Sequence, residues 1–498
     1  MTISPRKFTG FSPRRSIIPP TLCTLLLITV WSLGVPHPSF QWLGHRPEGP
    51  TNRPPSYPPT NIPSGPGPYP IDIDLADPEA PFVGWPLERV CNEAKRVEGL
   101  VFVCDNNSGG LGNIRNYIQT CLRYALEAGA TGITLPRIRQ RDDADLANIW
   151  TDYLPFTYMF DEGHFRAAFG RHCPHIRIYD NATAIPGVGE KEREIELITP
   201  KDFGDREECH PWDQNRNFQR FGDRFRAWLQ IGTDRPPPSA NHTRAIRFHW
   251  GVLWDWQVWY DGPEFATTFG SVLRFNEQLL RLGNKVLENM REFACEQQRQ
   301  QRVGGGSGSG GSATEKATGA FIGVHLRTES DAMDDWPTYL EQFDTFRRQA
   351  ILEGSNKGGS EEQGENDNNY FGAAYLATGD AAEAEKFVRA AATELSNMKV
   401  VGKRDLLEGE DLAELNSLTF DQQGIVDAVV LLASDFFVGT MPSSFSVYIA
   451  MKRHLRTGGL YTRPWKVGTT EGDGLSHMGG HYRKYWENWL FMWDGMWP

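Results

Sequence analysis

The segment that most constrains the fold is residues 319–331, which follow a stretch of glycine and serine. Within it, Phe321–Leu326 is apolar, contains β-branched residues and is bounded by small or polar residues, so it predicts a buried strand. Residues two apart on a strand point to the same side, so His325 and Arg327 can face one ligand together. Ligands of open α/β sheets bind beyond the carboxyl ends of the strands, which is where these two residues are expected.

An arginine at this place suits a phosphorylated ligand. Its guanidinium group can donate two parallel hydrogen bonds to phosphate oxygens, and it keeps its charge. The alternative is structural, with Arg327 capping the next helix or pairing with Glu329 or Asp331. These residues by themselves leave both interpretations open.

Length and composition predict a folded protein of two or more domains. The chain has 498 residues, a length greater than one ordinary core accommodates. Hydrophobic residues make up 39 % of it, which predicts a folded body. Its formal net charge of −12 argues against nucleic acid as a partner bound through a general basic field. The 16 tryptophans are interpreted as core or interface residues more readily than as platforms for stacking sugars.

The amino-terminal region predicts a membrane anchor followed by a stem. Residues 17–36 are apolar and about long enough to cross a bilayer core of roughly 30 Å. Basic residues without acidic ones precede them, which predicts a cytosolic tail at residues 1–16 and a lumenal body. Residues 37–80 are rich in proline and predict a disordered stem. We therefore expect a single-pass type II protein of the endoplasmic reticulum or Golgi membrane, the alternative being a signal peptide cleaved near Ser32 and Gly34.

Cysteine usage agrees with a lumenal body. Six cysteines follow the anchor, all of them before residue 303: Cys91, Cys104, Cys121, Cys173, Cys209 and Cys295. In an oxidising compartment six cysteines predict disulfide bonds, and the sequence does not choose among their fifteen possible pairings. The less favoured alternative is a metal cluster, drawn from His172, Cys173, His175, Cys209 and His210.

Three asparagines begin glycosylation sequons. Asn181 and Asn241 are expected to carry glycans on the surface. Asn106 begins a glycine-rich loop that suits ligand binding, so we expect it to remain unmodified.

A first domain is predicted over residues 81–302. The strand Leu100–Cys104 runs through a glycine-rich turn into the helix Ile114–Ala128, an arrangement that can present backbone N–H groups to a phosphate or sugar. A tight structural connection is the alternative. The remainder predicts a helix-rich region that ends in one long helix, Phe269–Arg299.

A second domain is predicted over residues 320–465, after a flexible glycine and serine insertion at 303–319 and before a tryptophan-rich extension at 466–498. The expected strands are Phe321–Leu326, Tyr370–Thr378, Lys399–Val401 and Asp435–Gly439. The expected helices are Trp336–Glu353, Ala381–Leu395, Gln422–Ala433 and one that reaches Arg453. This alternation predicts a parallel sheet with helices on both faces.

Three stretches together resemble one known family: residues 108–116, residues 324–331, and residues 434–446 with Arg453 after them. The chain resembles the GDP-fucose protein O-fucosyltransferase superfamily, including its α1,6-fucosyltransferase relatives, over roughly residues 98–465. The resemblance implies an α/β fold of the GT-B type, with two Rossmann-like domains, the donor held mainly by the second and the acceptor cleft between them.

The resemblance also implies which residues form the site. Those implied in catalysis are Arg327, His325, Asn113 and Asp331. Those implied in donor binding are Gly110, Gly112, Asn113, His325, Arg327, Asp380, Ser443, Ser444 and Phe445. In this assignment Asp380 helps to hold the guanine or ribose, and the glycines with Asn113 face the fucose and the acceptor. No metal ligands and no cofactor beyond the donor substrate GDP-fucose are implied.

The implied reaction is the inverting transfer of fucose from GDP-β-fucose to a protein or glycan acceptor. Some relatives have a glutamate in the first motif that can act as a base, whereas this chain has Gly109 and Gly110 there. Two alternatives remain: a transferase of the same superfamily that uses another deoxysugar such as rhamnose, and a catalytically silent lumenal binding protein. The sequence does not indicate the acceptor.

Overall fold

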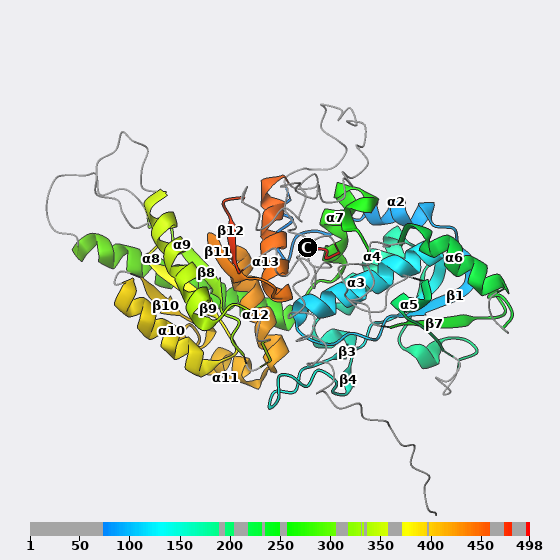
Figure 1. The fold of residues 1–498 in the computed structure, drawn as a ribbon, viewed down its shortest axis with the longest axis horizontal. Helices are drawn as coiled ribbons and strands as arrows, with labels where there is room; N and C mark the ends of the chain where they lie inside the picture. The colour runs from blue at the N-terminus through cyan, green and yellow to red at the C-terminus, as the bar shows by residue number, and fades with distance from the viewer. Residues whose placement is uncertain are drawn as a thin grey trace, which may run out of the picture. The chain divides into compact units, whose positions relative to one another are not determined.

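The protein is described here from a computed structural model (Figure 1). It describes residues 73–188, 195–203, 218–231, 235–249, 256–304, 317–329, 331–332, 336–356, 371–395, 398–458, 473–480 and 495–498. All of them belong to one compact unit, Pro70–Pro498. The predicted anchor lies outside these residues, and within them no helix has the length and apolar character needed to span a membrane.

The first half of the unit contains a five-stranded parallel sheet in the order β5-β2-β1-β7-β6. Its strands are β1 (Val97–Val103), β2 (Ala130–Thr134), β5 (Arg177–Tyr179), β6 (Glu196–Ile198) and β7 (Arg244–Phe248). The helices are α2 (Trp85–Glu93), α3 (Leu111–Ala128), α4 (Glu162–His172), α5 (Pro200–Phe203), α6 (Phe218–Ile231), α7 (Pro263–Thr268) and α8 (Glu277–Gly304). A short antiparallel pair, β3 (Ile138–Arg139) with β4 (Tyr153–Leu154), follows β2. Single 3-10 turns are η1 (Phe156–Tyr158), η2 (Ala182–Ala184), η5 (Val258–Asp261) and η6 (Phe269–Val272).

The link from β1 through α3 to β2 is fixed at two points. A disulfide joins Cys104, just after β1, to Cys121 within α3. At the C-terminus of α3 Gly129 caps the helix with a φ of 83°, and a Cβ there would lie 1.8 Å from the carbonyl oxygen of Lys95. Only glycine fits this left-handed position, so the chain can turn directly from α3 into β2.

The second half contains another five-stranded parallel sheet, in the order β10-β9-β8-β11-β12. Its strands are β8 (Phe321–His325), β9 (Ala373–Ala377), β10 (Lys399–Val401), β11 (Phe436–Thr440) and β12 (Ser476–Gly479). The helices are α9 (Tyr339–Asn356), α10 (Ala381–Glu394), α11 (Gly409–Ser417), α12 (Phe420–Ala433) and α13 (Ser444–His454), with turns η7 (Lys403–Asp405) and η8 (Leu455–Thr457). The strand order reverses between β8 and β11, which is the switch point where doubly wound sheets bind ligands.

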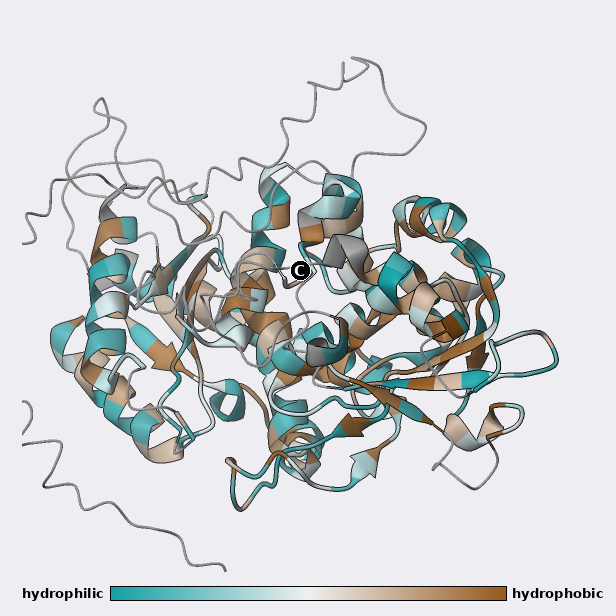
Figure 2. Cartoon of the chain, turned by 45° about the vertical axis from the view of Figure 1, so that its right-hand side comes forward, coloured by the Kyte–Doolittle hydropathy of each residue, from teal (hydrophilic) through white to brown (hydrophobic). Residues whose placement is uncertain are grey.

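Alternate residues of β8 enter two different cores. Ile322 and Val324 pack with α9 and α10 in one cluster, whereas Phe321 belongs to a larger cluster with α8, α12 and α13. That larger cluster continues into the core of the first half, so buried apolar contacts link the two sheets. Figure 2 shows many strand segments coloured as hydrophobic and helices that carry both polar and apolar bands.

Most elements predicted for the second half are confirmed, with ends that differ by a few residues. The single helix Phe269–Arg299 is wrong at its start, because η6 ends at Val272 and α8 begins at Glu277. Asn276 explains the break: its side-chain Oδ1 accepts a hydrogen bond from the N–H of Leu279 at 3.0 Å and so caps α8. Four strands of the first sheet lie in the region predicted to be helix-rich, and β12 lies in the extension for which no strand was expected.

Two disulfides are present among the described residues, Cys91–Cys173 and Cys104–Cys121. Cys295 is a free thiol, and Cys209 lies outside the described residues. Cys173 is therefore not available as a metal-binding thiolate. Trp256 is buried in the first core, which confirms the interpretation of that tryptophan as a core residue.

Candidate active site

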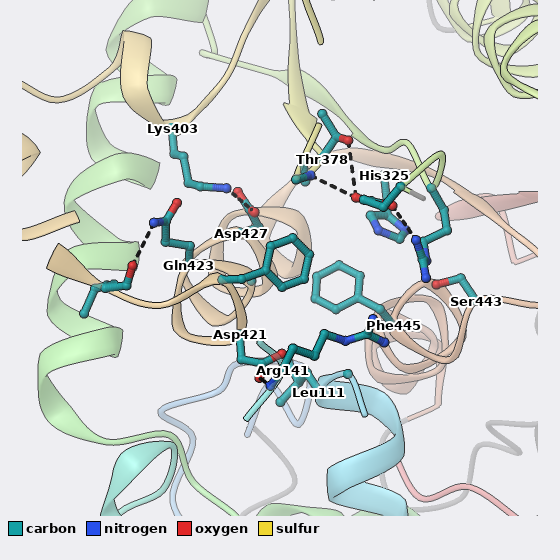
Figure 3. A pocket seen from close by; sticks show the side chains of 18 of the residues that line it. Leu111, Arg141, His325, Thr378, Lys403, Asp421, Gln423, Asp427, Ser443 and Phe445 are labelled. Carbon is teal, nitrogen blue, oxygen red and sulfur yellow. Dashed lines mark hydrogen bonds and ion pairs between the residues drawn. The ribbon is translucent and has the colours of Figure 1, made fainter. Parts of the chain in front are cut away.

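A cavity of about 410 Å³ opens at the switch point of the second sheet (Figure 3). Parts of both halves line it, namely the N-terminus of α3, the carboxyl ends of β8 and β9, and the first turns of α12 and α13. Figure 3 shows Phe445 in the middle of this group, with His325 and Ser443 on one side and Lys403 and Asp427 on the other. The cavity therefore has two chemically distinct ends.

His325 occupies the last position of β8. Its Nδ1 lies 2.7 Å from Oγ of Ser446, which also accepts a hydrogen bond of 3.1 Å from the N–H of Thr440. This contact with the buried Ser446 hydroxyl fixes the orientation of the imidazole ring, so that Nε2 is the ring nitrogen left for a ligand. Burial lowers the pKa of His325 to about 4, so the imidazole is neutral at physiological pH.

Arg327 is held by two carboxylates. Its Nη1 donates to Oε2 of Glu329 at 2.6 Å, and its Nη2 donates to Oδ1 of Asp331 at 2.7 Å. Burial opposes ionisation, but the two carboxylates outweigh it and raise the pKa of Arg327. The structural pairing considered from the sequence is thus present in this ligand-free state, while the guanidinium group also lines the cavity.

Two helix N-termini meet at the same place. Ser443 caps α13, because its Oγ accepts from the N–H of Ser446 at 3.4 Å. α3 begins after Gly110, which has no side chain to cap it, and Gly112 packs directly against the backbone of Ser444. Helix N-termini carry partial positive charge and free N–H groups, so both favour an anion.

The opposite end of the cavity contains a buried ion pair. Nζ of Lys403 donates to Oδ2 of Asp427 at 2.6 Å, and the hydroxyl of Tyr375 donates to Oδ1 at 2.7 Å. Arg404 lies beside this pair and donates from Nη2 to Oε1 of Gln423 at 2.9 Å. This mixture of donors and acceptors suits a nucleobase rather than a second phosphate.

Asp421 is a buried carboxylate in the first turn of α12. Its Oδ2 accepts a hydrogen bond of 2.7 Å from the backbone N–H of Arg141. Burial raises the pKa of Asp421 to about 6, and the hydrogen bond and charge of Arg141 offset this only in part. The carboxyl group therefore changes its protonation close to neutral pH.

The structure brings together most of the residues predicted for the site. The members that line the cavity are Gly110, Asn113, His325, Arg327, Ser443, Ser444 and Phe445. Gly112 and Asp331 lie just behind it, against Ser444 and Arg327 respectively. Asp380 is placed differently: its Oδ1 accepts from the N–H groups of Ala382 and Glu383 and caps α10, so its contact with the guanine or ribose stays a prediction.

Sequence reasoning missed six charged residues of the cavity, namely Arg141, Asp143, Lys403, Arg404, Asp421 and Asp427. Arg141 lies on the β3–β4 loop, in a part of the chain without a recognisable motif. Asp427 could have been found from the sequence, because it stands in the middle of the apolar run of α12. A charged residue in such a place is buried only when it is paired, which indicates a structural or functional site.

A doubly wound sheet that presents arginine and two helix N-termini at its switch point defines a protein that binds a phosphorylated ligand. Compared with known protein families, residues 100–456 match the family described as GDP-fucose protein O-fucosyltransferase. The match covers well over half of the chain, and the chain therefore belongs to this family of GDP-fucose-dependent fucosyltransferases. A search among curated proteins found no match.

Among solved structures, the chain matches POFUT1 in complex with GDP at 13 % identity and a TM-score of 0.40, covering 78 % of this chain and 100 % of that chain. A mutant of Arabidopsis thaliana FUT1 in complex with GDP matches at 11 % identity and a TM-score of 0.32, covering 74 % of this chain and 72 % of that chain. NodZ α-1,6-fucosyltransferase soaked with GDP-fucose matches at 13 % identity and a TM-score of 0.32, covering 71 % of this chain and 92 % of that chain.

Proposed function

We propose that the cavity binds GDP-fucose and that the protein transfers the fucose, with inversion, to a hydroxyl group of a protein or glycan. The observation that carries this proposal is the position of Arg327, which lines the cavity at the carboxyl end of β8 beside the N-terminus of α13. In this arrangement the diphosphate lies at the end with His325 and Ser443, and the guanine lies toward Lys403 and Asp427. The proposal includes a GT-B arrangement of the two halves.

The chemistry asked of the protein is mainly the stabilisation of a leaving group. The bond between the anomeric carbon and the β-phosphate oxygen breaks, and its electron pair stays on GDP. The acceptor oxygen forms the new bond on the opposite face and loses its proton to the solvent. Arg327 and the two helix N-termini face the negative charge that grows on the diphosphate, so they lower the barrier electrostatically, and we propose that no metal is needed for this step.

Asn113 is proposed to face the fucose. Its Oδ1 is buried and accepts no hydrogen bond from the residues that the structure describes. A buried acceptor of this kind is costly unless a ligand supplies a donor, and sugar hydroxyls are such donors. Because Gly109 and Gly110 precede it, no carboxylate of this motif serves as a base.

A lumenal location in the secretory pathway remains part of the proposal. It is supported by the two disulfides, which are typical of oxidising compartments. Asn181 and Asn241 are exposed, as expected for glycosylated asparagines.

The proposal is tested without knowledge of the acceptor, by using water in its place. The full-length protein is incubated with GDP-β-fucose, and the released sugar is followed by proton NMR before its anomers equilibrate. We expect slow release of fucose that is initially the α anomer, and the same release to be lost in Arg327→Ala. GDP-rhamnose and GDP-mannose serve as donor controls.

Release of the β anomer would contradict inversion. Faster turnover of GDP-rhamnose than of GDP-fucose would contradict the donor. Tight binding of GDP-fucose without any release, and without transfer to acceptor mixtures, would identify a silent binding protein.

A further inference from the structure

We infer that Arg141 is a second phosphate-binding arginine, which reaches the donor diphosphate from the first half of the protein. This inference rests on the proposed function and names a residue that the sequence motifs do not contain. Arg141 lies on the loop between β3 and β4 and lines the cavity. Figure 3 shows its side chain extending past Asp421 and Leu111 beneath Phe445.

Arg141 and Arg327 are joined through one carboxylate. Arg327 donates to Oδ1 of Asp331, and Nη1 of Arg141 donates to Oδ2 of the same group. A Cβ built on Gly110 would lie 3.6 Å from Nη2 of Arg141, so the guanidinium group also lies against the N-terminus of α3. The two arginines and that helix end thus surround the same part of the cavity.

The loop holds its place without the Arg141 side chain. The backbone N–H of Arg141 donates to Asp421 at 2.7 Å, and the N–H of Phe420 donates in return to Oδ1 of Asp143 at 2.9 Å. The hydroxyl of Thr151 donates to the carbonyl of Gln140 at 2.7 Å and closes the loop. These contacts hold the loop in addition to the ion pair of Arg141 with Asp331, so a ligand can take the place of that ion pair without releasing the loop.

One donor of Arg141 has no use in the ligand-free state. Its Nε is buried and donates to none of the residues that the structure describes, while Nη1 donates to Leu146 and Asp331. A buried N–H without an acceptor costs free energy, and phosphate oxygens are the acceptors that a guanidinium fork matches best. Nε of Arg115 and of Arg139 is also unpaired among the described residues, but of the three only Arg141 lines the cavity, where an anionic ligand can supply the acceptor.

The charges lead to the same conclusion. Arg327 alone faces two carboxylates, Glu329 and Asp331, so without Arg141 this cluster of ion pairs would have a net charge of minus one. Asp143 and Asp421 also line the cavity beside Arg141 and add further negative charge. His325 adds nothing, because it is neutral. A diphosphate would be repelled by such a site. With Arg141 the two guanidinium groups balance the two carboxylates, and the diphosphate can replace Asp331 between them.

The test compares nucleotides that share guanosine but differ in phosphate. Binding of guanosine, GMP and GDP to the full-length protein is measured by calorimetry for the wild type, Arg141→Ala, Arg141→Lys and Arg327→Ala. Arg139→Ala is the matched control, because Arg139 lies on β3 and stacks on Tyr153 with 4.2 Å between guanidinium carbon and ring centroid, away from the cavity. Thermal unfolding of each variant reports its stability.

We expect Arg141→Ala to weaken GDP binding by about 10- to 100-fold while guanosine binding stays unchanged. Arg141→Lys should recover part of this loss, since it restores the charge but not the fork. The inference is overturned if Arg141→Ala weakens GDP and guanosine by the same factor, or neither, while Arg327→Ala weakens GDP selectively. Absence of GDP binding in the wild type would instead overturn the proposed function itself.

Discussion

Gly112 of α3 lies against the backbone carbonyl of Ser444 in α13, and a Cβ built on Gly112 would come within 2.4 Å of that oxygen. The contact sets the distance between the two helix N-termini that border the cavity. It also joins the first glycine-rich motif to the Ser-Ser-Phe motif, which lie more than three hundred residues apart in the chain. A close backbone approach thus explains the glycine, and its contact with the donor stays a prediction.

Replacing Gly112 with alanine should therefore separate α3 from α13. We expect a loss of about 1–3 kcal/mol in the free energy of unfolding, as for other overpacked sites, together with weaker GDP binding. Chemical denaturation and calorimetry measure the two effects. Gly170→Ala is the control, since Gly170 lies in α4 with nothing within 4 Å of its added Cβ, and should be neutral or stabilising by up to about 1 kcal/mol. Equal behaviour of the two variants would refute this role of Gly112.

Asp421 predicts a pH dependence of stability. Its folded-state pKa of about 6 lies above that of the unfolded chain, so the folded state binds the proton more tightly. The contribution of Asp421 to the free energy of unfolding should therefore fall by about 3 kcal/mol as the pH rises from about 4 to about 6. Asp421→Asn keeps an acceptor for the N–H of Arg141 and should lack this component in denaturation curves across that range. Identical pH profiles of the two proteins would contradict the prediction.

His325 should remain neutral throughout the physiological range. With a pKa near 4, its NMR resonances are expected to stay constant between about pH 5.5 and 8. Ser446→Ala removes the hydroxyl that holds Nδ1 of the ring, so turnover should fall by about five- to tenfold. A wild-type titration near the ordinary histidine pKa would show that the imidazole is not buried as described.

The disulfide Cys104–Cys121 should support the donor site as well as the fold. The bond spans the glycine-rich turn between β1 and α3, so replacing both cysteines with serine should cost about 2–4 kcal/mol of stability and also weaken GDP binding. The Cys91–Cys173 bond ties α2 to the end of α4 and provides the comparison. Its removal should cost a similar amount of stability but leave GDP affinity unchanged. Equal losses of affinity in both variants would assign the effect to general loosening.

Local sequence patterns were sufficient for most of the second half of the fold, with α11 and β12 as the elements not predicted. Its strands are apolar runs that alternate with helices of ordinary length, so β8, β9 and β11 were recognisable one by one. The first sheet was harder, because β5 and β6 have three residues each and depend on pairing with strands distant in sequence. The start of α8 depended on the Asn276 cap, which interrupts an otherwise continuous helical pattern.

The residues of the candidate site also fall into two groups, those that local motifs predict and those that only tertiary contacts bring together. His325, Arg327 and Ser443 belong to motifs within single strand-to-helix connections, so their common position at the switch point followed from the sequence. Arg141 and Asp421 approach each other only when the β3–β4 loop docks on α12, and no local pattern predicts that contact. The carboxylate of Asp380, which follows β9, caps α10, and its contact with the donor stays a prediction.

The central claim is that the cavity is a guanine-nucleotide site built around Arg327. Its most direct test is calorimetric titration of GDP, UDP and ADP into the full-length wild-type protein and into Arg327→Ala. We predict selective binding of GDP by the wild type and a loss of about 10- to 100-fold in the variant, whose fold stays intact in thermal unfolding. A well-folded wild type that binds none of the three nucleotides, or binds them equally, would contradict the account.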